Sequence, residues 1–226
     1  MKIIHRPIFK KLVLSYEQNF TESTLNKLFE SSNSKTYRKG ATIYQEGEKV
    51  KGIYRVVNGR VKLWKMGSSY TRSLILYFVF PEDPFGLIDL FIRERERRSS
   101  ATTMDHDTTI EFVPIFEVER FLRREPKICL EISVFLKKNY NSILERYAEL
   151  QSQNIHNKVL KAIRKIANER GTPVEGGFLL KTIKHQDLSD YIGLSRQSVT
   201  QSFNYLKEKG KIDYDRQQIF VKNSKQ

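Results

Sequence analysis

The sequence predicts an α+β fold in which a β-rich N-terminal domain and a mostly helical C-terminal domain flank one long helix. From Thr36 onward, short β-branched and aromatic runs separated by glycine are typical of a β-sandwich or barrel. Apolar residues at helical spacing follow, and the rest of the chain mixes helical patterns with short strand patterns. The predicted parts are residues 1–125, 126–156 and 157–226.

The first 35 residues contain one helical pattern. Leu25, Leu28 and Phe29 follow a segment rich in Thr, Glu and Ser, with the spacing of one helix face. We expect this helix to pack against the β-rich domain, and we assign it no chemistry.

A hairpin is predicted inside the β-rich domain. Asn58-Gly59 separates two strand-like runs, residues 54–57 and 60–63, and both turn residues tolerate a positive φ angle. Two further strand patterns lie at residues 74–80 and 108–113.

The long helix carries an apolar seam. A shorter helix is predicted before it, over residues 114–125, because the residue preceding Pro126 disfavours the α region. The seam advances in steps of three or four residues, close to the average of a coiled coil. Its members are Ile132, Leu136, Tyr140, Ile143, Tyr147, Leu150 and Asn154. Such a seam packs either on its own domain or on a partner helix, and Asn154 is also placed to cap the next helix.

The C-terminal domain begins with a helix over residues 157–170 and, after two glycine-containing breaks, a strand over residues 178–183. Residues 185–210 then predict two helices joined by a tight turn, with Gly193 ending the first and Ser195 capping the second. The last segment predicts a two-stranded wing that turns near residues 215–217.

The second helix of this pair has two chemically different faces. Its apolar side chains Val199, Phe203 and Leu206 share one face, and polar side chains occupy another. A helix-turn-helix that inserts its second helix into the DNA major groove needs this division, although an ordinary helical hairpin shares the apolar spacing. The long amide and guanidinium side chains suited to base edges are those of Arg196, Gln197 and Gln201. Candidate phosphate contacts are Lys184, His185, Ser195 and Ser198.

The charge of the chain supports a polyanionic partner. The formal net charge is +14. Residues 157–226 hold fourteen Lys or Arg against seven Asp or Glu, and the other 156 residues hold twenty-six against nineteen. The C-terminal domain therefore has about twice the positive charge density, which favours double-stranded DNA as its partner.

Two segments resemble a known family. HQDLSDYIGLSRQSVTQSFNYLKEKG is similar to the winged helix-turn-helix of the Crp/Fnr superfamily of bacterial transcription regulators, and the run from Lys39 to Lys62 resembles its cyclic-nucleotide-binding jelly roll. The resemblance implies a homodimer formed along the long helix, a recognition helix at residues 196–209 in the major groove, and contact with RNA polymerase. It also implies a different DNA site from the usual one, because relatives often have Glu and Arg at the positions of Gln197 and Gln201.

The same resemblance argues against cyclic AMP as the effector. Nucleotide-binding relatives use a Gly-Glu pair and an Arg-Ser pair around the cyclic phosphate and ribose, and the matching residues here are Gly86, Leu87, Arg98 and Ser99. A leucine cannot accept the hydrogen bond of a ribose hydroxyl. On the long helix, Ile143 and Leu144 stand where relatives place polar groups against adenine. Asp89 is a candidate replacement for the missing carboxylate.

Other effectors and other classes of protein remain as alternatives. An iron–sulfur cluster needs about four thiolates, and Cys129 is the one cysteine, so we expect neither a cluster nor an internal disulfide. Haem held by His106 stays open, as do another small effector and DNA binding without any ligand. The four histidines are far apart in sequence, so we assign no catalytic or metal-binding residues. With no signal peptide and no transmembrane run, we expect a cytoplasmic protein without a membrane partner.

Overall fold

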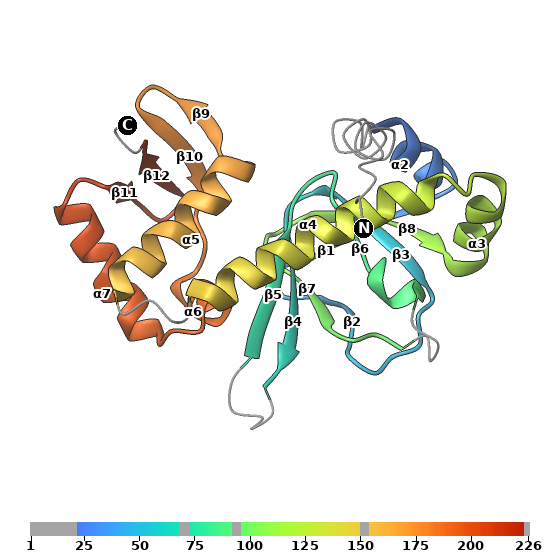
Figure 1. Cartoon of the computed structure of the whole chain (residues 1–226), viewed down its shortest axis with the longest axis horizontal. Helices are drawn as coiled ribbons and strands as arrows, with labels where there is room; N and C mark the ends of the chain where they lie inside the picture. Colours follow the sequence, from blue (N-terminus) through green and yellow to red (C-terminus); the bar gives the residue numbers. More distant parts are fainter. Residues whose placement is uncertain (1–21, 68–72, 92–95, 150–153, 224–226) are drawn as a thin grey trace, which may run out of the picture. The chain divides into compact units, whose positions relative to one another are not determined.

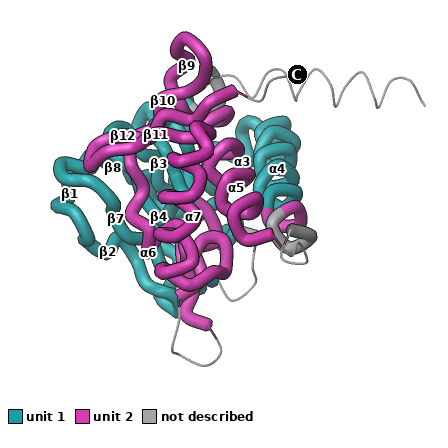
Figure 2. The backbone as a smooth tube through the Cα atoms, turned by 90° about the vertical axis from the view of Figure 1, so that its left-hand side faces the viewer, with its two compact units in different colours: residues 1–63, 78–142 teal, residues 64–77, 143–226 magenta. Residues whose placement is uncertain are grey.

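The computed structural model describes residues 22–67, 73–91, 96–149 and 154–223 (Figure 1). The chain divides into two compact units (Figure 2). Unit 1 comprises residues 1–63 and 78–142, and unit 2 comprises residues 64–77 and 143–226. This division differs from the predicted boundaries, because residues 64–77 and the end of the long helix are grouped with the C-terminal domain. One physical link is the hydroxyl of Ser73, which donates to the Asp190 carboxylate at 2.9 Å.

The predicted β-sandwich is confirmed as a jelly roll. Two four-stranded sheets have the orders β1-β8-β3-β6 and β2-β7-β4-β5, the arrangement of an eight-stranded double sheet. The strands are β1 Asn33–Tyr37, β2 Thr42–Tyr44, β3 Gly52–Asn58, β4 Val61–Met66, β5 Ser73–Val79, β6 Pro84–Phe85, β7 Ser100–Thr103 and β8 Thr108–Pro114. Inward-facing residues such as Ile53, Val61, Ile75 and Ile110 are almost fully buried, so they form the core.

The predicted hairpin at Asn58-Gly59 is wrong. The turn exists, and Gly59 has a φ of 84°, but β3 and β4 belong to different sheets. The turn therefore carries the chain from one sheet to the other, and β3 pairs with β8 and β6 instead. A Cβ on Gly59 would lie 2.5 Å from the Oγ1 of Thr108, so the crossing also needs a residue without a side chain.

The helices of the sensor region pack together on one apolar cluster. They are α2 Glu22–Phe29, the 3-10 helix η1 Ile88–Phe91, α3 Ile115–Arg124 and α4 Ile128–Glu149. Leu28 and Phe29 are buried in this cluster beside Val118, Ile128 and Ile132, which confirms the predicted packing of the first helix. None of the helices within the described ranges has the length and apolar character needed to cross a membrane.

The seam of α4 has two different environments. Ile132 is 1% exposed and Leu136 packs against the same apolar cluster. Farther along the helix, Tyr140 is 60% exposed and Ile143 is 39% exposed. The side chains of Tyr147 and Leu150 lie outside the described residues. The first part of the seam therefore packs on its own domain, and in the second part Tyr140 and Ile143 present apolar side chains at the surface.

The C-terminal domain is a winged helix-turn-helix. Its elements are α5 Ile155–Arg170, β9 Thr172–Val174, β10 Gly177–Lys181, α6 His185–Ile192, α7 Arg196–Glu208, β11 Ile212–Tyr214 and β12 Gln218–Lys222. The sheet order is β11-β12-β10-β9, which confirms the predicted wing. β9 was not predicted, because Pro173 and its short length conceal an edge strand. The Asn154 side chain accepts from the backbone N–H of Asn157 at 3.0 Å, so the predicted cap of α5 is confirmed.

Candidate nucleic-acid interface and sensor cradle

The turn between α6 and α7 has the predicted geometry. Gly193 adopts the left-handed conformation, with φ 71° and ψ 25°, and its N–H donates to the Ser189 carbonyl. Leu194 donates to the same carbonyl at 3.1 Å. The Ser195 hydroxyl then accepts from the N–H of Ser198 at 3.0 Å and caps α7. These local bonds fix the direction in which α7 leaves the turn.

The two faces of α7 are separated as the sequence predicts. Val199, Phe203 and Leu206 are at most 3% exposed and pack into the C-terminal domain. The three candidate base-reading residues are exposed and lie in the first half of the helix: Arg196, Gln197 and Gln201. The structure therefore leaves all three side chains exposed on α7, away from its buried face.

The side chain of His185 forms a hydrogen bond and a ring contact with the recognition helix α7. Its Nδ1 lies 2.9 Å from the Thr200 Oγ1, and Thr200 donates its own hydroxyl hydrogen to the Arg196 carbonyl. His185 Nδ1 is therefore the donor to Thr200. The ring also packs 4.4 Å from the ring of Phe203. Burial, followed by the charge of Arg196, lowers the pKa of His185, so the neutral ring is favoured.

Of the other three candidate phosphate residues, Ser195 and Ser198 lie at the start of α7, and Lys184 directly precedes α6. Lys184 is exposed and makes no side-chain cap bond to α6. The hydroxyls of Ser195 and Ser198 are 2.8 Å apart, so one donates to the other and one hydroxyl hydrogen remains for another acceptor. The backbone N–H of Ser198 is already bonded to Ser195, so the serine pair would meet a phosphate through a hydroxyl.

A second histidine, which the sequence did not single out, joins α5 to α7. His156 Nδ1 lies 3.0 Å from Ser202 Oγ, which donates to the Ser198 carbonyl, so the histidine is the donor. Its ring stacks on Tyr205 with centroids 4.2 Å apart. The first turn of α5 is thus held against the helix that carries the candidate base-reading residues. Spacing in the sequence does not reveal this contact, because the two residues are 46 positions apart.

The wing is fastened to α7 by Tyr214. Its ring meets Phe203 edge-on at 5.1 Å, and its hydroxyl donates to the Asn204 side chain at 2.8 Å. The turn of the wing is closed by Asp215, which accepts from the backbone N–H groups of Gln217 and Gln218. These two bonds lower the pKa of Asp215.

In the sensor domain, four of the six predicted effector residues, Gly86, Leu87, Arg98 and Ser99, do not form one polar pocket. Leu87 is 2% exposed and packs in the apolar cluster with α2, α3 and α4. Ser99 is buried, whereas the side chain of Arg98 is exposed and its backbone N–H donates to Asp89. The arginine beside Gly86 is Arg97, whose Nη1 donates to the Gly86 carbonyl at 3.2 Å.

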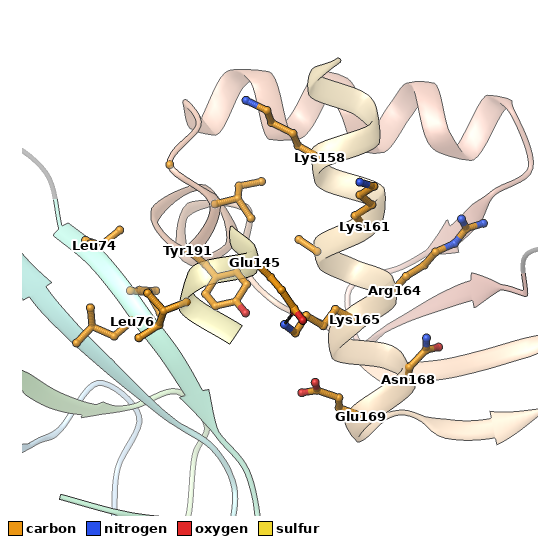
Figure 3. Close-up of a pocket in the computed structure, with 15 residues that line it drawn as sticks. Leu74, Leu76, Glu145, Lys158, Lys161, Arg164, Lys165, Asn168, Glu169 and Tyr191 are labelled. Atoms are coloured by element: carbon orange, nitrogen blue, oxygen red, sulfur yellow. Dashed lines mark hydrogen bonds and ion pairs between the residues drawn. The ribbon is translucent and has the colours of Figure 1, made fainter. Parts of the chain in front are cut away.

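The other two predicted effector residues, Ile143 and Leu144, are exposed. Ile143 lines a groove of about 660 Å³ within unit 2. Figure 3 shows Leu74 and Leu76 on one side of this groove and a row of basic side chains from α5 on another. Lys165 of that row forms an ion pair with Glu145. The groove thus combines an apolar lining with a charged rim, from segments far apart in sequence.

Comparison with known proteins agrees with both domains. A family model described as the Crp-like helix-turn-helix domain matches residues 158–226, and one described as the cyclic nucleotide-binding domain matches residues 34–125. The chain belongs to the Crp/Fnr superfamily of transcription regulators. As a Crp/Fnr regulator it has a helix-turn-helix DNA-binding domain and a domain of the effector-binding type, and the proteins of this family are regulators and not enzymes.

Individual members of the superfamily are distant from this regulator. The CRP-like cAMP-activated global transcriptional regulator of Mycobacterium tuberculosis is 24% identical over 192 residues, 83% of each chain. The structure of FixK2 from Bradyrhizobium japonicum matches with a TM-score of 0.74 and 22% identity, over 85% of this chain and 93% of that one. The c-di-GMP responsive regulator CLP of Xanthomonas campestris matches with a TM-score of 0.73 and 17% identity, over 90% and 100%. These structural matches show a shared fold.

Proposed function

We propose that this regulator binds a palindromic DNA site as a homodimer and reads each half-site with α7. The observation that carries the proposal is the exposed group Arg196, Gln197 and Gln201 on a helix whose other face is buried. Arg196 suits guanine O6 and N7, and each glutamine suits adenine N6 and N7. Lys184, the serine pair at the start of α7 and the region of His185 supply the phosphate contacts.

The homodimer is supported by the second part of the α4 seam. Tyr140 and Ile143 are exposed on a helix whose earlier seam residues are buried in their own domain. Large apolar side chains at coiled-coil spacing are stabilised when a second copy of the helix covers them. A two-fold dimer also matches the two-fold symmetry of a palindromic site.

We further propose that activity is set by a small effector other than cyclic AMP, or needs no ligand. Leu87 is packed in an apolar cluster, so neither its side chain nor its position serves a ribose hydroxyl. His106, the candidate haem ligand, is exposed in a turn. The proposed regulator contacts RNA polymerase, catalyses no reaction, and works in the cytoplasm with no membrane partner, as suits a protein whose target is DNA.

The test is selection of binding sites from a genomic DNA library with the purified protein, with and without cyclic AMP, at two salt concentrations. We expect a palindrome whose half-sites are about one helical turn apart, and no effect of the nucleotide. A strong dependence on cyclic AMP would contradict the effector proposal. Salt-sensitive binding without any selected motif would contradict specific reading by α7, because phosphate contacts alone would explain it.

The role of Gln197 is tested by Gln197→Glu. We expect a changed base preference, by about 1–3 kcal/mol at one position of the half-site, and a smaller change in nonspecific affinity. The matched control is Gln217→Glu, the same change of charge at an exposed position of the wing turn. The control should weaken binding to all sequences to a similar degree. Uniform losses in both variants would refute the assignment of Gln197 as a base-reading residue.

A further inference from the structure

The sensor domain contains a fully buried arginine close to the segment that holds the ligand phosphate in nucleotide-binding relatives. The Arg97 side chain is 1% exposed, and its guanidinium lies over the ring of Tyr44 at 4.1 Å and that of Tyr54 at 5.4 Å. Its Nη2 donates to the Gly52 carbonyl at 2.6 Å. A buried guanidinium with neutral partners alone would be strongly destabilising, so this site requires an anion.

The anion is supplied by the chain itself. Asp89, on η1, is 4% exposed, and its Oδ2 accepts from Arg97 Nη1 at 3.0 Å. Its Oδ1 accepts from the backbone N–H of Arg98 at 3.2 Å. One carboxylate thus receives one guanidinium N–H and one backbone N–H, the kinds of donor that hold an oxyanion. We call the site formed by Gly86, Asp89, Arg97 and the backbone N–H of Arg98 the cradle. Arg97 Nε finds no acceptor among the described residues, so the cradle retains one donor that a single carboxylate does not use.

The backbone around the cradle is shaped to the arginine. Gly86 has a φ of 78°, and a Cβ there would lie 2.6 Å from Arg97 Nη1. The missing side chain of Gly86 therefore makes room for Arg97. The next residue, Leu87, turns into the apolar cluster. A cyclic nucleotide does not fit these residues: the guanidinium that would meet its phosphate is already paired, and the ribose would lack a carboxylate partner.

We propose that Asp89 takes the place of a ligand phosphate on Arg97 and thereby excludes cyclic nucleotides from the cradle. Asp89 is then a specificity-determining residue, which holds η1 beside Arg97 and the backbone of Arg98 without ligand. This inference rests on the proposed function, in which the effector is not cyclic AMP. Its test measures the stability of the sensor domain and not DNA binding, so either proposal can fail while the other stands.

The test is thermal unfolding of the full-length protein and of Asp89→Ala, in phosphate and in chloride at equal ionic strength, and with cyclic AMP. We expect the wild-type Tm to be the same in all three conditions. Asp89→Ala should lower the Tm by about 5 °C or more in chloride, because Arg97 loses its counter-ion. Phosphate should restore about half of that loss or more, because it refills the cradle.

The matched control is Asp105→Ala. Asp105 forms another buried ion pair of the sensor domain, with Arg60, at 2.8 Å and with side-chain exposures of 9% and 8%. The Asp105→Ala variant should have a lower Tm than the wild type in chloride, and phosphate should not restore that loss. Equal restoration of both variants, or none in Asp89→Ala, would overturn the proposal, as would a rise of the wild-type Tm with cyclic AMP. If Asp89→Ala does not fold in chloride, the yield of refolding in phosphate against chloride, for both variants, decides in the same way.

Discussion

The side chain of His185 links α6 with α7 and, through Phe203, with the wing of the C-terminal domain. It lies at the first position of α6, donates to Thr200 on α7, and packs against Phe203, which also meets Tyr214 of the wing. A residue that the sequence offers as a phosphate contact is therefore also a positioning residue for α7. Both roles depend on its protonation, because the Nδ1–H is used inside the domain and Nε2 is the atom that gains a proton.

The protonation of His185 predicts a pH dependence of stability. Burial and Arg196 lower its pKa in the folded protein below the ordinary 6.5. Below pH 6.5 the unfolded chain therefore binds more protons than the native state, and the free energy of unfolding falls until the folded pKa is passed. The contribution is complete above pH 6.5. We expect His185→Gln to flatten this part of the pH dependence, measured by urea unfolding at a series of pH values.

The control for that series is Gln201→Ala, at an exposed position of α7 whose side chain has no titratable group. It should leave the slope of stability against pH between neutral and acid conditions as in the wild type. A slope that is unchanged in His185→Gln would show that the ring does not titrate differently in the two states.

For single residues, the helical repeat predicts which side of a helix a side chain faces. It does not predict which other residue that side chain contacts. The buried and exposed sides of α7 follow from the 3.6-residue repeat, so Val199 and Gln197 fall on the expected faces. The sensor cradle is different, because η1 and the approach to β7 have no repeat to set side-chain direction. Adjacent arginines there have opposite environments: Arg97 is buried and Arg98 is exposed. Only the folded backbone decides which of the two guanidinium groups meets Asp89.

Among the secondary-structure elements, local signals predicted the helix ends well and strand pairing poorly. The cap at Ser195 and the left-handed Gly193 depend on neighbouring residues alone, so the sequence contains what is needed to find them. The partners of β3 are β8 and β6, more distant in the chain than β4. In a jelly roll the next strand often lies in the other sheet, so a hairpin rule based on Asn58-Gly59 cannot hold there.

The cap of α5 gives a prediction at the scale of one element. Asn154 accepts from the N–H of Asn157, so Asn154→Ala leaves that donor without its partner in the first turn. We expect a loss of about 1 kcal/mol in the free energy of unfolding, measured with urea. Asn157→Ala is the matched control, because it keeps the backbone N–H and exchanges one exposed asparagine for alanine. If both variants lose the same stability, the cap contributes nothing.

At the scale of the whole molecule, the proposed regulator works only if two copies present two α7 helices at a fixed spacing. A monomer would read a single half-site, and the gain from binding the second half-site as an intramolecular step would be lost. In the proposed dimer, the exposed seam residues Tyr140 and Ile143 of α4 provide this pairing surface. Dimer stability and preference for a palindrome should therefore change together.

This coupling is tested by Ile143→Glu, which places a charge on the exposed end of the seam. We expect the dimer dissociation constant, measured by sedimentation equilibrium, to rise by at least about tenfold, since each dimer would bury two carboxylates. Binding to a palindrome should fall toward that of a single half-site. Leu130→Glu is the control, because Leu130 lies on the same helix, is 47% exposed against 39% for Ile143, and is not part of the seam. If the two variants dissociate alike, the copies pair through another surface and the half-site spacing must be explained from that surface instead.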